Sequence, residues 1–334
     1  MRTATTRVYA PPGDLVRLTS DEPFVFQLAD RLWEPGAKAH SGDAIGIEIL
    51  GEDFLEGAWE GPAGASGSPR GDDGLSFSFE ENQRWVHEDA EFRCDVPGAL
   101  EIRIDLTRAR VAARIAPPLS VLLSKKSPSS LSLRSFLART LLEAPAAVLL
   151  GRRGWQVLHA GAVVGPRGAA VVRGPSGAGK STLVAAAHRA GLGVLGDESV
   201  FASRREPDAL AASVRDLALR EDSARLLDIF DATHPAFTGR EVKRRVDLFN
   251  GSAPRDRLAR RAAAVLLGPR EPGPARLAPL EGVAFLDAFR AGGIPQERPG
   301  DPDAVARAWA GNGWLLSGAS DLDGAVRLLK SLVT

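Results

Sequence analysis

Residues 168–198 read GAAVVRGPSGAGKSTLVAAAHRAGLGVLGDE, and positions 174–182 match the phosphate-binding pattern G-x-x-x-x-G-K-[ST] at every fixed position. Glycines in such a loop let the backbone wrap so that successive N–H groups point inward at an anion. The pattern predicts that Lys180 reaches the terminal phosphates of ATP and that the Ser181 hydroxyl holds Mg²⁺. The residues predicted to cradle the triphosphate are Gly174, Pro175, Ser176, Gly177, Ala178, Gly179, Lys180, Ser181 and Thr182.

The residues on both sides of this loop favour the same interpretation. Residues 168–173 form a valine-rich run bounded by glycine, which indicates a buried strand. Residues 182–190 are good helix formers, and the glycine at position 191 is a natural stop. Residues 192–196 indicate a second strand, which ends in Asp197 and Glu198. The order strand, loop, helix, strand predicts an α/β fold. The alternative is a glycine-rich turn with an incidental lysine, but then every fixed residue of the motif and both flanking elements would be present by chance.

Composition narrows the class of protein. The chain has 334 residues, a length typical of about two domains. Its 42 basic and 42 acidic residues balance, so no overall field favours nucleic acid or an anionic membrane as a partner. The single cysteine, Cys94, excludes an intrachain disulfide and a cysteine-based metal cluster. No apolar segment reaches the roughly 18 residues that span a bilayer, and residues 1–7 lack the apolar core of a secretory signal, so we expect a cytoplasmic protein.

The chain divides by pattern into two domains, residues 1–130 and 131–334. Short apolar or alternating runs in the first predict a β-rich, antiparallel accessory domain with strands at 24–28, 45–50, 75–80, 100–106 and 110–115. Residues 57–74 and 124–130 have the composition of loops. In the second domain we expect helices at 131–142 with more helix to 150, and at 221–230, 282–290 and 322–333, and strands at 155–159, 162–165, 199–203, 244–248 and 262–267.

Several polar residues are candidates for chemistry beside the loop. Asp197 and Glu198 follow a strand, the place where ligand-binding residues gather in open α/β sheets. A carboxylate there can hold magnesium or accept the proton of an attacking hydroxyl, and neighbouring side chains on a strand point to opposite faces, so the two acids should have different roles. The alternative for each is a solvated acid in a turn.

Two further candidates are less specific. His159 ends a predicted strand before the loop, although a lone histidine is more often structural. Arg244 and Arg245 lie in a basic cluster that could offset charge on a transferring phosphate, although basic triplets usually face solvent.

Three segments together resemble the C-terminal domain of bacterial HPr kinase/phosphorylase, and more closely the HPr-kinase-related proteins: LHAGAVV at 158–164, VVRGPSGAGKST at 171–182 and GLGVLGDE at 191–198. The resemblance covers about residues 150–330 and implies a fold like that of phosphoenolpyruvate carboxykinase, a mixed sheet flanked by helices. It implies that His159 is the family's histidine before the loop and that Asp197 is the acid/base. Residues 217–222 and 243–248 are similar to the related proteins' downstream pattern, which implies that Arg244 or Arg245 meets phosphate.

The chain also departs from the family pattern at two places. The second aspartate of the family pair is Glu198 here, and the late glycine-rich signature linked to phosphorolysis is not evident. The sequence therefore predicts an ATP- and Mg²⁺-dependent kinase of a serine-type hydroxyl on a protein or peptide, with Ser181, Asp197 and Glu198 around the metal. Two alternatives stay open: a kinase of small hydroxy metabolites on the same scaffold, and a nucleotide-binding regulatory module without phosphotransfer. Because HPr kinases are hexamers, the resemblance allows a homo-oligomer.

Overall fold

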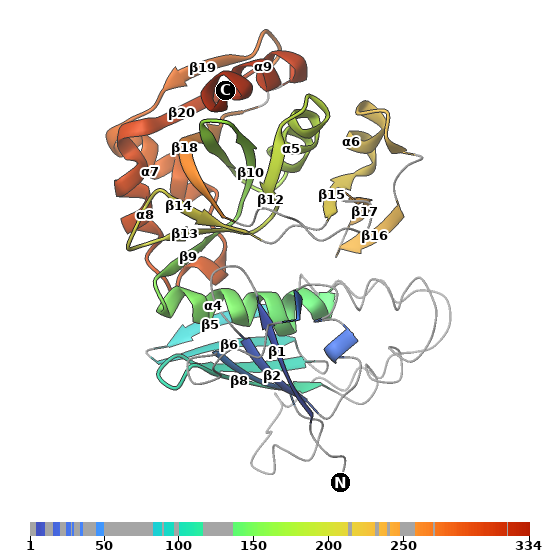
Figure 1. Ribbon diagram of the computed structural model, residues 1–334, viewed down its shortest axis with the longest axis vertical. Coiled ribbons are helices and arrows are strands. Elements are labelled where there is room, and N and C mark those ends of the chain that lie inside the picture. Colours follow the sequence, from blue (N-terminus) through green and yellow to red (C-terminus); the bar gives the residue numbers. More distant parts are fainter. Residues whose placement is uncertain are drawn as a thin grey trace. The chain divides into compact units, whose positions relative to one another are not determined.

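The computed structural model describes residues 5–10, 16–20, 25–27, 29, 34–35, 45–49, 83–88, 90–96, 100–115, 136–212, 216–230, 234–238, 241–247, 258–269, 271–318 and 320–334. It divides into two compact units, one made of Met1–Leu149 with Ala236–Val242 and the other of Leu150–Pro235 with Lys243–Thr334. The predicted α/β class is confirmed, with mixed sheets and helices in the described residues (Figure 1). The predicted domain boundary after residue 130 lies outside the described residues.

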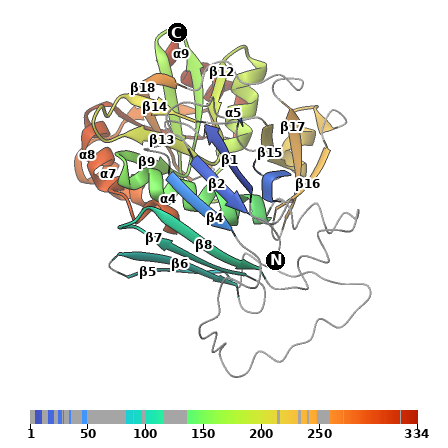
Figure 2. The ribbon, with the colours of Figure 1, turned by 60° about the horizontal axis from the view of Figure 1, so that its bottom comes forward.

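The first unit contains a sheet with the strand order β3-β1-β2-β4-β8-β7-β6-β5 in its described part (Figure 2). These strands are β1 (Thr5–Ala10), β2 (Val16–Ser20), β3 (Glu34–Pro35), β4 (Ile45–Ile49), β5 (Arg84–Glu88), β6 (Glu91–Val96), β7 (Leu100–Asp105) and β8 (Arg110–Ile115). Buried and partly exposed residues alternate along β2, β6 and β7, so one face is covered, as predicted. The sheet is mixed and not purely antiparallel, because β4 pairs in parallel with both β2 and β8.

One predicted strand in this unit is wrong. Residues 25–27, within the predicted strand 24–28, are helical. Val25 and Phe26 are adjacent and both buried, which a strand with one wet face does not allow, and a short apolar run cannot distinguish the two structures from sequence. The predicted strand 75–80 and the predicted loops 57–74 and 124–130 lie outside the described residues.

A long helical segment ends the first unit and enters the second. It comprises a π-helical stretch, η2 (Ala138–Glu143), and α4 (Ala144–Arg152), and confirms the helix predicted up to residue 150. Within the first unit, Gln83 Nε2 donates to Thr140 Oγ1 of η2 at 3.4 Å. Most residues of the segment are buried, consistent with its run of apolar residues.

The second unit is built on a mixed sheet with the order β12-β10-β11-β18-β14-β13-β9 in its described part, to which β20 and β19 add beside β18. Its strands are β9 (Trp155–Leu158), β10 (Ala160–Gly165), β11 (Gly168–Arg173), β12 (Gly193–Gly196), β13 (Val200–Ser203), β14 (Ala209–Ala211), β18 (Leu258–Leu267), β19 (Arg276–Pro279) and β20 (Gly313–Ser317). β11 and β18 run parallel, and β11 and β10 antiparallel. The strands predicted around the phosphate loop are confirmed.

Helices cover both faces of this central sheet (Figure 1). They are α5 (Lys180–Arg189), α7 (Gly282–Ala291), α8 (Pro302–Trp309) and α9 (Leu322–Val333), with short 3₁₀ turns η4 (Pro295–Glu297) and η5 (Ala310–Asn312). Val172 and Val265 pack in the cluster under α5 and α9, whereas Val171 and Leu266 pack in the cluster under α7 and α8. Neighbouring strand residues thus point to opposite faces, as the valine-rich runs predicted for a sheet buried on both sides.

A smaller sheet completes the described fold. β15 (Asp216–Arg220) pairs antiparallel with β17 (Glu241–Asp247), and β16 (His234–Thr238) lies beside β17. The helix predicted at 221–230 is shorter, because α6 (Glu221–Leu226) ends before Asp228, whose φ of 51° is left-handed. None of the helices in the described ranges combines the length and the apolar character needed to cross a membrane.

Candidate functional site

The phosphate-loop motif lies between the end of β11 and the start of α5, as the sequence predicted. Gly177 and Gly179 have φ values of 79° and 102°, in the left-handed region that only glycine adopts without strain. The Ala178 N–H donates to the Pro175 carbonyl at 3.1 Å, which closes the turn. An α-helix leaves its first N–H groups without partners inside the helix, so the start of α5 supplies amide donors and a positive dipole end to an anion in the loop.

The lysine of the motif is folded back over the loop. Lys180 Nζ donates to the carbonyls of Gly174 at 2.8 Å and Pro175 at 3.2 Å, and the side chain is buried. Burial lowers the pKa of Lys180 to about 8, although the negative charge of Asp197 acts in the opposite direction. The predicted contact of Lys180 with the terminal phosphates of a nucleotide stays a prediction.

Asp197 directly follows β12 and contacts the motif. The Ser181 hydroxyl donates to Asp197 Oδ1 at 2.9 Å, so two of the residues that the sequence predicted around a metal are in contact. Asp197 Oδ2 is enclosed and makes no hydrogen bond of ordinary geometry within the described structure, although the Ala218 backbone N–H also acts on this carboxyl and opposes the rise in its pKa. Burial, followed by the nearby negative charge of Glu198, raises the pKa of Asp197 to about 7. The result is a desolvated carboxylate that exchanges a proton near neutral pH, beside the predicted magnesium ligand.

These two residues suit a magnesium ion. Mg²⁺ prefers hard oxygen ligands and commonly uses one or two carboxylates together with phosphate oxygens and water. Ser181 supplies a hydroxyl oxygen and Asp197 an enclosed carboxylate oxygen, both of the kind that Mg²⁺ takes as ligands. Within the described ranges no group of three or more His, Cys, Asp or Glu residues is arranged to hold a metal by itself. Mg²⁺ takes an octahedral set of ligands, so phosphate oxygens and water would complete the set begun by Ser181 and Asp197.

Glu198 has a separate position, as expected for neighbouring acids. Its φ of 68° is left-handed, which is costly for a residue other than glycine. Its Oε1 pairs with Lys243 Nζ at 2.7 Å, and both side chains are partly buried. Its backbone carbonyl lies 3.1 Å from His159 Nδ1. The strained backbone thus turns the side chain toward Lys243 and the carbonyl toward His159, and the predicted metal contact of Glu198 stays a prediction.

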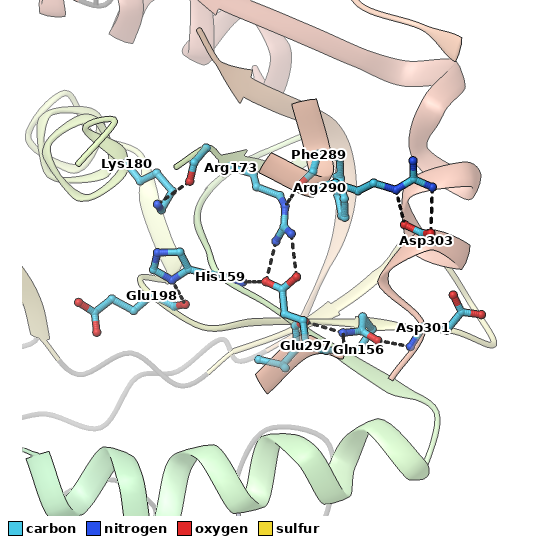
Figure 3. A network of polar contacts seen from close by, with 12 residues as sticks. Gln156, His159, Arg173, Lys180, Glu198, Phe289, Arg290, Glu297, Asp301 and Asp303 are labelled. Atoms are coloured by element: carbon cyan, nitrogen blue, oxygen red, sulfur yellow. Dashed lines mark hydrogen bonds and ion pairs between the residues drawn. The ribbon is translucent and has the colours of Figure 1, made fainter. Parts of the chain in front are cut away.

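His159 lies between the loop and Glu198 (Figure 3). Burial, reinforced by the positive charge of Lys180, lowers the pKa of His159 to about 4, so the ring is neutral at pH 7. Because a carbonyl only accepts hydrogen bonds, Nδ1 carries the ring proton and Nε2 is left as an acceptor. The His159 backbone N–H also donates to Glu297 Oε1 at 2.6 Å.

The basic cluster on β17 is divided between two faces. Arg244 stacks on Phe230, with its Cζ 3.9 Å from the ring centroid, and donates to the Phe230 carbonyl at 3.0 Å. Lys243 and Arg245 share the other face of the strand, since side chains alternate along it. Lys243 pairs with Glu198 and acts electrostatically on Lys180 and Asp197. The predicted phosphate contacts of Arg244 and Arg245 stay predictions.

Other residues near the loop were not identified from sequence. Arg220, at the end of β15, has its Nη1 4.0 Å from where a Cβ on Gly177 would lie. Ser223 of α6 accepts a hydrogen bond from Thr182 Oγ1 at 2.8 Å. Glu297 reaches His159 from far along the chain. The only available signal was the position of Arg220 within residues 217–222, the segment similar to the related proteins' downstream pattern, whereas Ser223 lies just outside it.

No protein-family model matches the chain, and no curated protein matches it at a significant level. The resemblance to HPr-kinase-related proteins therefore stays a prediction that rests on the motif residues, and the function must be argued from the site.

Proposed function

We propose that this chain is an ATP- and Mg²⁺-dependent phosphotransferase that phosphorylates a serine-type hydroxyl on a protein or peptide. The observation that carries the proposal is the 2.9 Å hydrogen bond from Ser181 Oγ to Asp197 Oδ1. It joins the hydroxyl that the loop motif assigns to magnesium with a carboxylate whose raised pKa suits proton transfer. A phosphate loop alone would support nucleotide binding, whereas this carboxylate adds a group that can activate an attacking alcohol.

Each residue has a distinct part in the proposed reaction. The acceptor oxygen forms a bond to the γ-phosphorus of ATP, the bond from that phosphorus to the bridging oxygen breaks, and ADP leaves. The hydroxyl proton passes to the Asp197 carboxylate. Lys180 and the loop amides bind the phosphates, and neutral His159 offers Nε2 as an acceptor on the side of Lys180. Magnesium, when bound by Ser181 and Asp197, would neutralise phosphate charge.

The finer parts of the proposal rest on the resemblance of residues 158–198. It favours a phosphoenolpyruvate carboxykinase-like fold for the second unit and allows assembly into a homo-oligomer. The cytoplasmic location is proposed from the sequence pattern alone. The acceptor class is tested by incubating the protein with ATP labelled on the γ-phosphate, Mg²⁺ and either serine-containing peptides or free hydroxy metabolites. We expect label on peptides. Label confined to metabolites would favour the small-molecule kinase, and no label on either, with intact ATP binding, would favour the regulatory module.

Arg220 is expected to assist phosphotransfer, because its guanidinium lies beside Gly177 of the loop. A cation placed on a transferring phosphate stabilises the charge that develops there. Replacing Arg220 with alanine should lower the transfer rate about 10-fold at saturating ATP, measured by release of ADP. The matched control is Arg225→Ala, since Arg225 lies on α6, pairs with exposed Glu221 and stacks on Phe230. Equal rates in the two variants would refute the role of Arg220.

A further inference from the structure

A buried network of charges lies beneath the phosphate loop (Figure 3). Arg173, the last residue of β11, makes two parallel bonds to Glu297, from Nη1 to Oε1 at 2.9 Å and from Nη2 to Oε2 at 2.7 Å. Its Nε donates to the Phe289 carbonyl at 2.7 Å, and its guanidinium stacks on the Phe289 ring. The side chains of both Arg173 and Glu297 are almost completely buried, at 1% and 3% exposure.

The Glu297 carboxylate accepts a third hydrogen bond, which connects this pair to the site. Its Oε1 accepts the backbone N–H of His159 at 2.6 Å. The backbone of Glu297 is in turn held by Gln156, whose Nε2 donates to the Glu297 carbonyl at 3.1 Å and whose Oε1 accepts from the Asp301 N–H at 2.6 Å. One glutamate therefore joins the end of β11, the residue after β9 and the turn η4.

Stability alone does not account for this arrangement. Removing two charges from water is costly, and apolar residues of similar volume often stabilise a protein as well as a buried ion pair does. An apolar pair at these positions would fill the space but would offer no acceptor to the His159 N–H. A buried amide without a partner is itself unfavourable, so the backbone at His159 would move. The carboxylate of Glu297 thus supplies an interaction that packing cannot replace.

We propose that Glu297 is a positioning residue that fixes the backbone of His159, and that Arg173 holds Glu297 in place. Fixing this backbone sets the ring so that Nδ1 meets the Glu198 carbonyl and Nε2 remains an acceptor on the side of Lys180. Arg173 directly precedes Gly174, so the same contact anchors the first residue of the phosphate loop. The role in phosphotransfer rests on the proposed function, whereas the effect on the ring of His159 does not.

Two double variants separate positioning from packing. R173M/E297Q and R173M/E297L both remove the buried charges and keep similar volumes, but only glutamine can accept the His159 N–H. The control is R290M/D303L, which removes an exposed bidentate pair between α7 and α8. For each protein we would measure the thermal midpoint, ATP affinity, transfer rate and the ¹⁵N shifts of the His159 ring. The ring signal is assigned by its loss in His159→Gln.

We expect wild type, R173M/E297Q and the control to show His159 protonated at Nδ1 only, with transfer rates within about 5-fold of each other. R173M/E297L should show a mixture of the two ring tautomers and a rate about 10- to 100-fold lower, with ATP affinity changed less than about 3-fold. Identical tautomers and rates in the glutamine and leucine variants would overturn the proposal. If R173M/E297L does not fold, the proposal is tested on R173M/E297Q alone. A mixture of the two His159 ring tautomers in folded R173M/E297Q would then overturn the proposal. Absence of transfer in wild type would refute the proposed function, while the ring signal would still decide the role of Glu297.

Discussion

The Asp197→Asn variant is expected to transfer phosphate about 10³-fold more slowly than the wild-type chain at saturating ATP and acceptor. Asparagine keeps the shape of the side chain and can still accept the Ser181 hydrogen bond, so the loop and the fold should be preserved. It cannot accept a proton from the attacking hydroxyl, and it is a poorer ligand for Mg²⁺ than a carboxylate. Rapid-quench measurement of phosphopeptide formation reports the loss directly. The exposed Asp287→Asn variant on α7 is the control for loss of one negative charge.

The pH dependence gives this prediction a second readout. The pKa of Asp197 is raised to about 7, so the carboxylate is protonated and inactive as a base below that value. The pKa of Lys180 is lowered to about 8, so its positive charge is lost above that value. Since kcat/KM reports the free enzyme, it should rise about tenfold per pH unit below 7, peak between 7 and 8 and then fall. Asp197→Asn should lack the acidic limb, and a variant that retains both limbs and the full rate would contradict the role of Asp197.

The Lys180→Met variant should lower the transfer rate by about 10²- to 10³-fold. Methionine fills most of the volume of the lysine chain but has no charge, and the γ-phosphate then loses a cation in a site where solvent is excluded. Because the ammonium is buried at some cost in desolvation, its removal should leave the thermal midpoint of the free protein unchanged or higher. Lys330→Met is the matched control, because Lys330 is an exposed residue of α9. A transfer rate in Lys180→Met that equals that of the control would contradict the assigned role of the loop lysine.

The part of the site whose residues lie close together in the sequence could be predicted from the sequence. The strand before the loop, the helix after it and the strand ending at Asp197 lie within residues 168–198, where each element has its own signal in glycine spacing and valine content. The meeting of Ser181 and Asp197 followed from that order, because a strand–loop–helix–strand unit brings the loop and the next strand end to one edge.

The rest depends on contacts between distant residues. Arg173 and Glu297 are 124 positions apart, and nothing in the neighbourhood of either residue indicates a buried charge. The basic cluster at 243–245 can be recognised in the sequence. The face of β17 on which each of its residues lies depends on the pairing of β17 with β15, which the sequence does not indicate. That register places Lys243 toward Glu198 and Arg244 against Phe230. The helix at residues 25–27 was missed because a short apolar run has no period that distinguishes helix from strand.

The central claim is that the amides and the lysine of residues 174–182 grip the phosphates of a nucleotide. Isothermal titration of the full chain with ATP, in the presence and absence of Mg²⁺, tests it most directly, with Lys180→Met measured in parallel. A charge-assisted hydrogen bond contributes about 1.5–3 kcal/mol, so the variant should bind about 10- to 100-fold more weakly than the wild type. Saturable binding to the wild type, strengthened by Mg²⁺ and weakened by that much in Lys180→Met, is the predicted result. No heat of ATP association with or without Mg²⁺ would contradict the account.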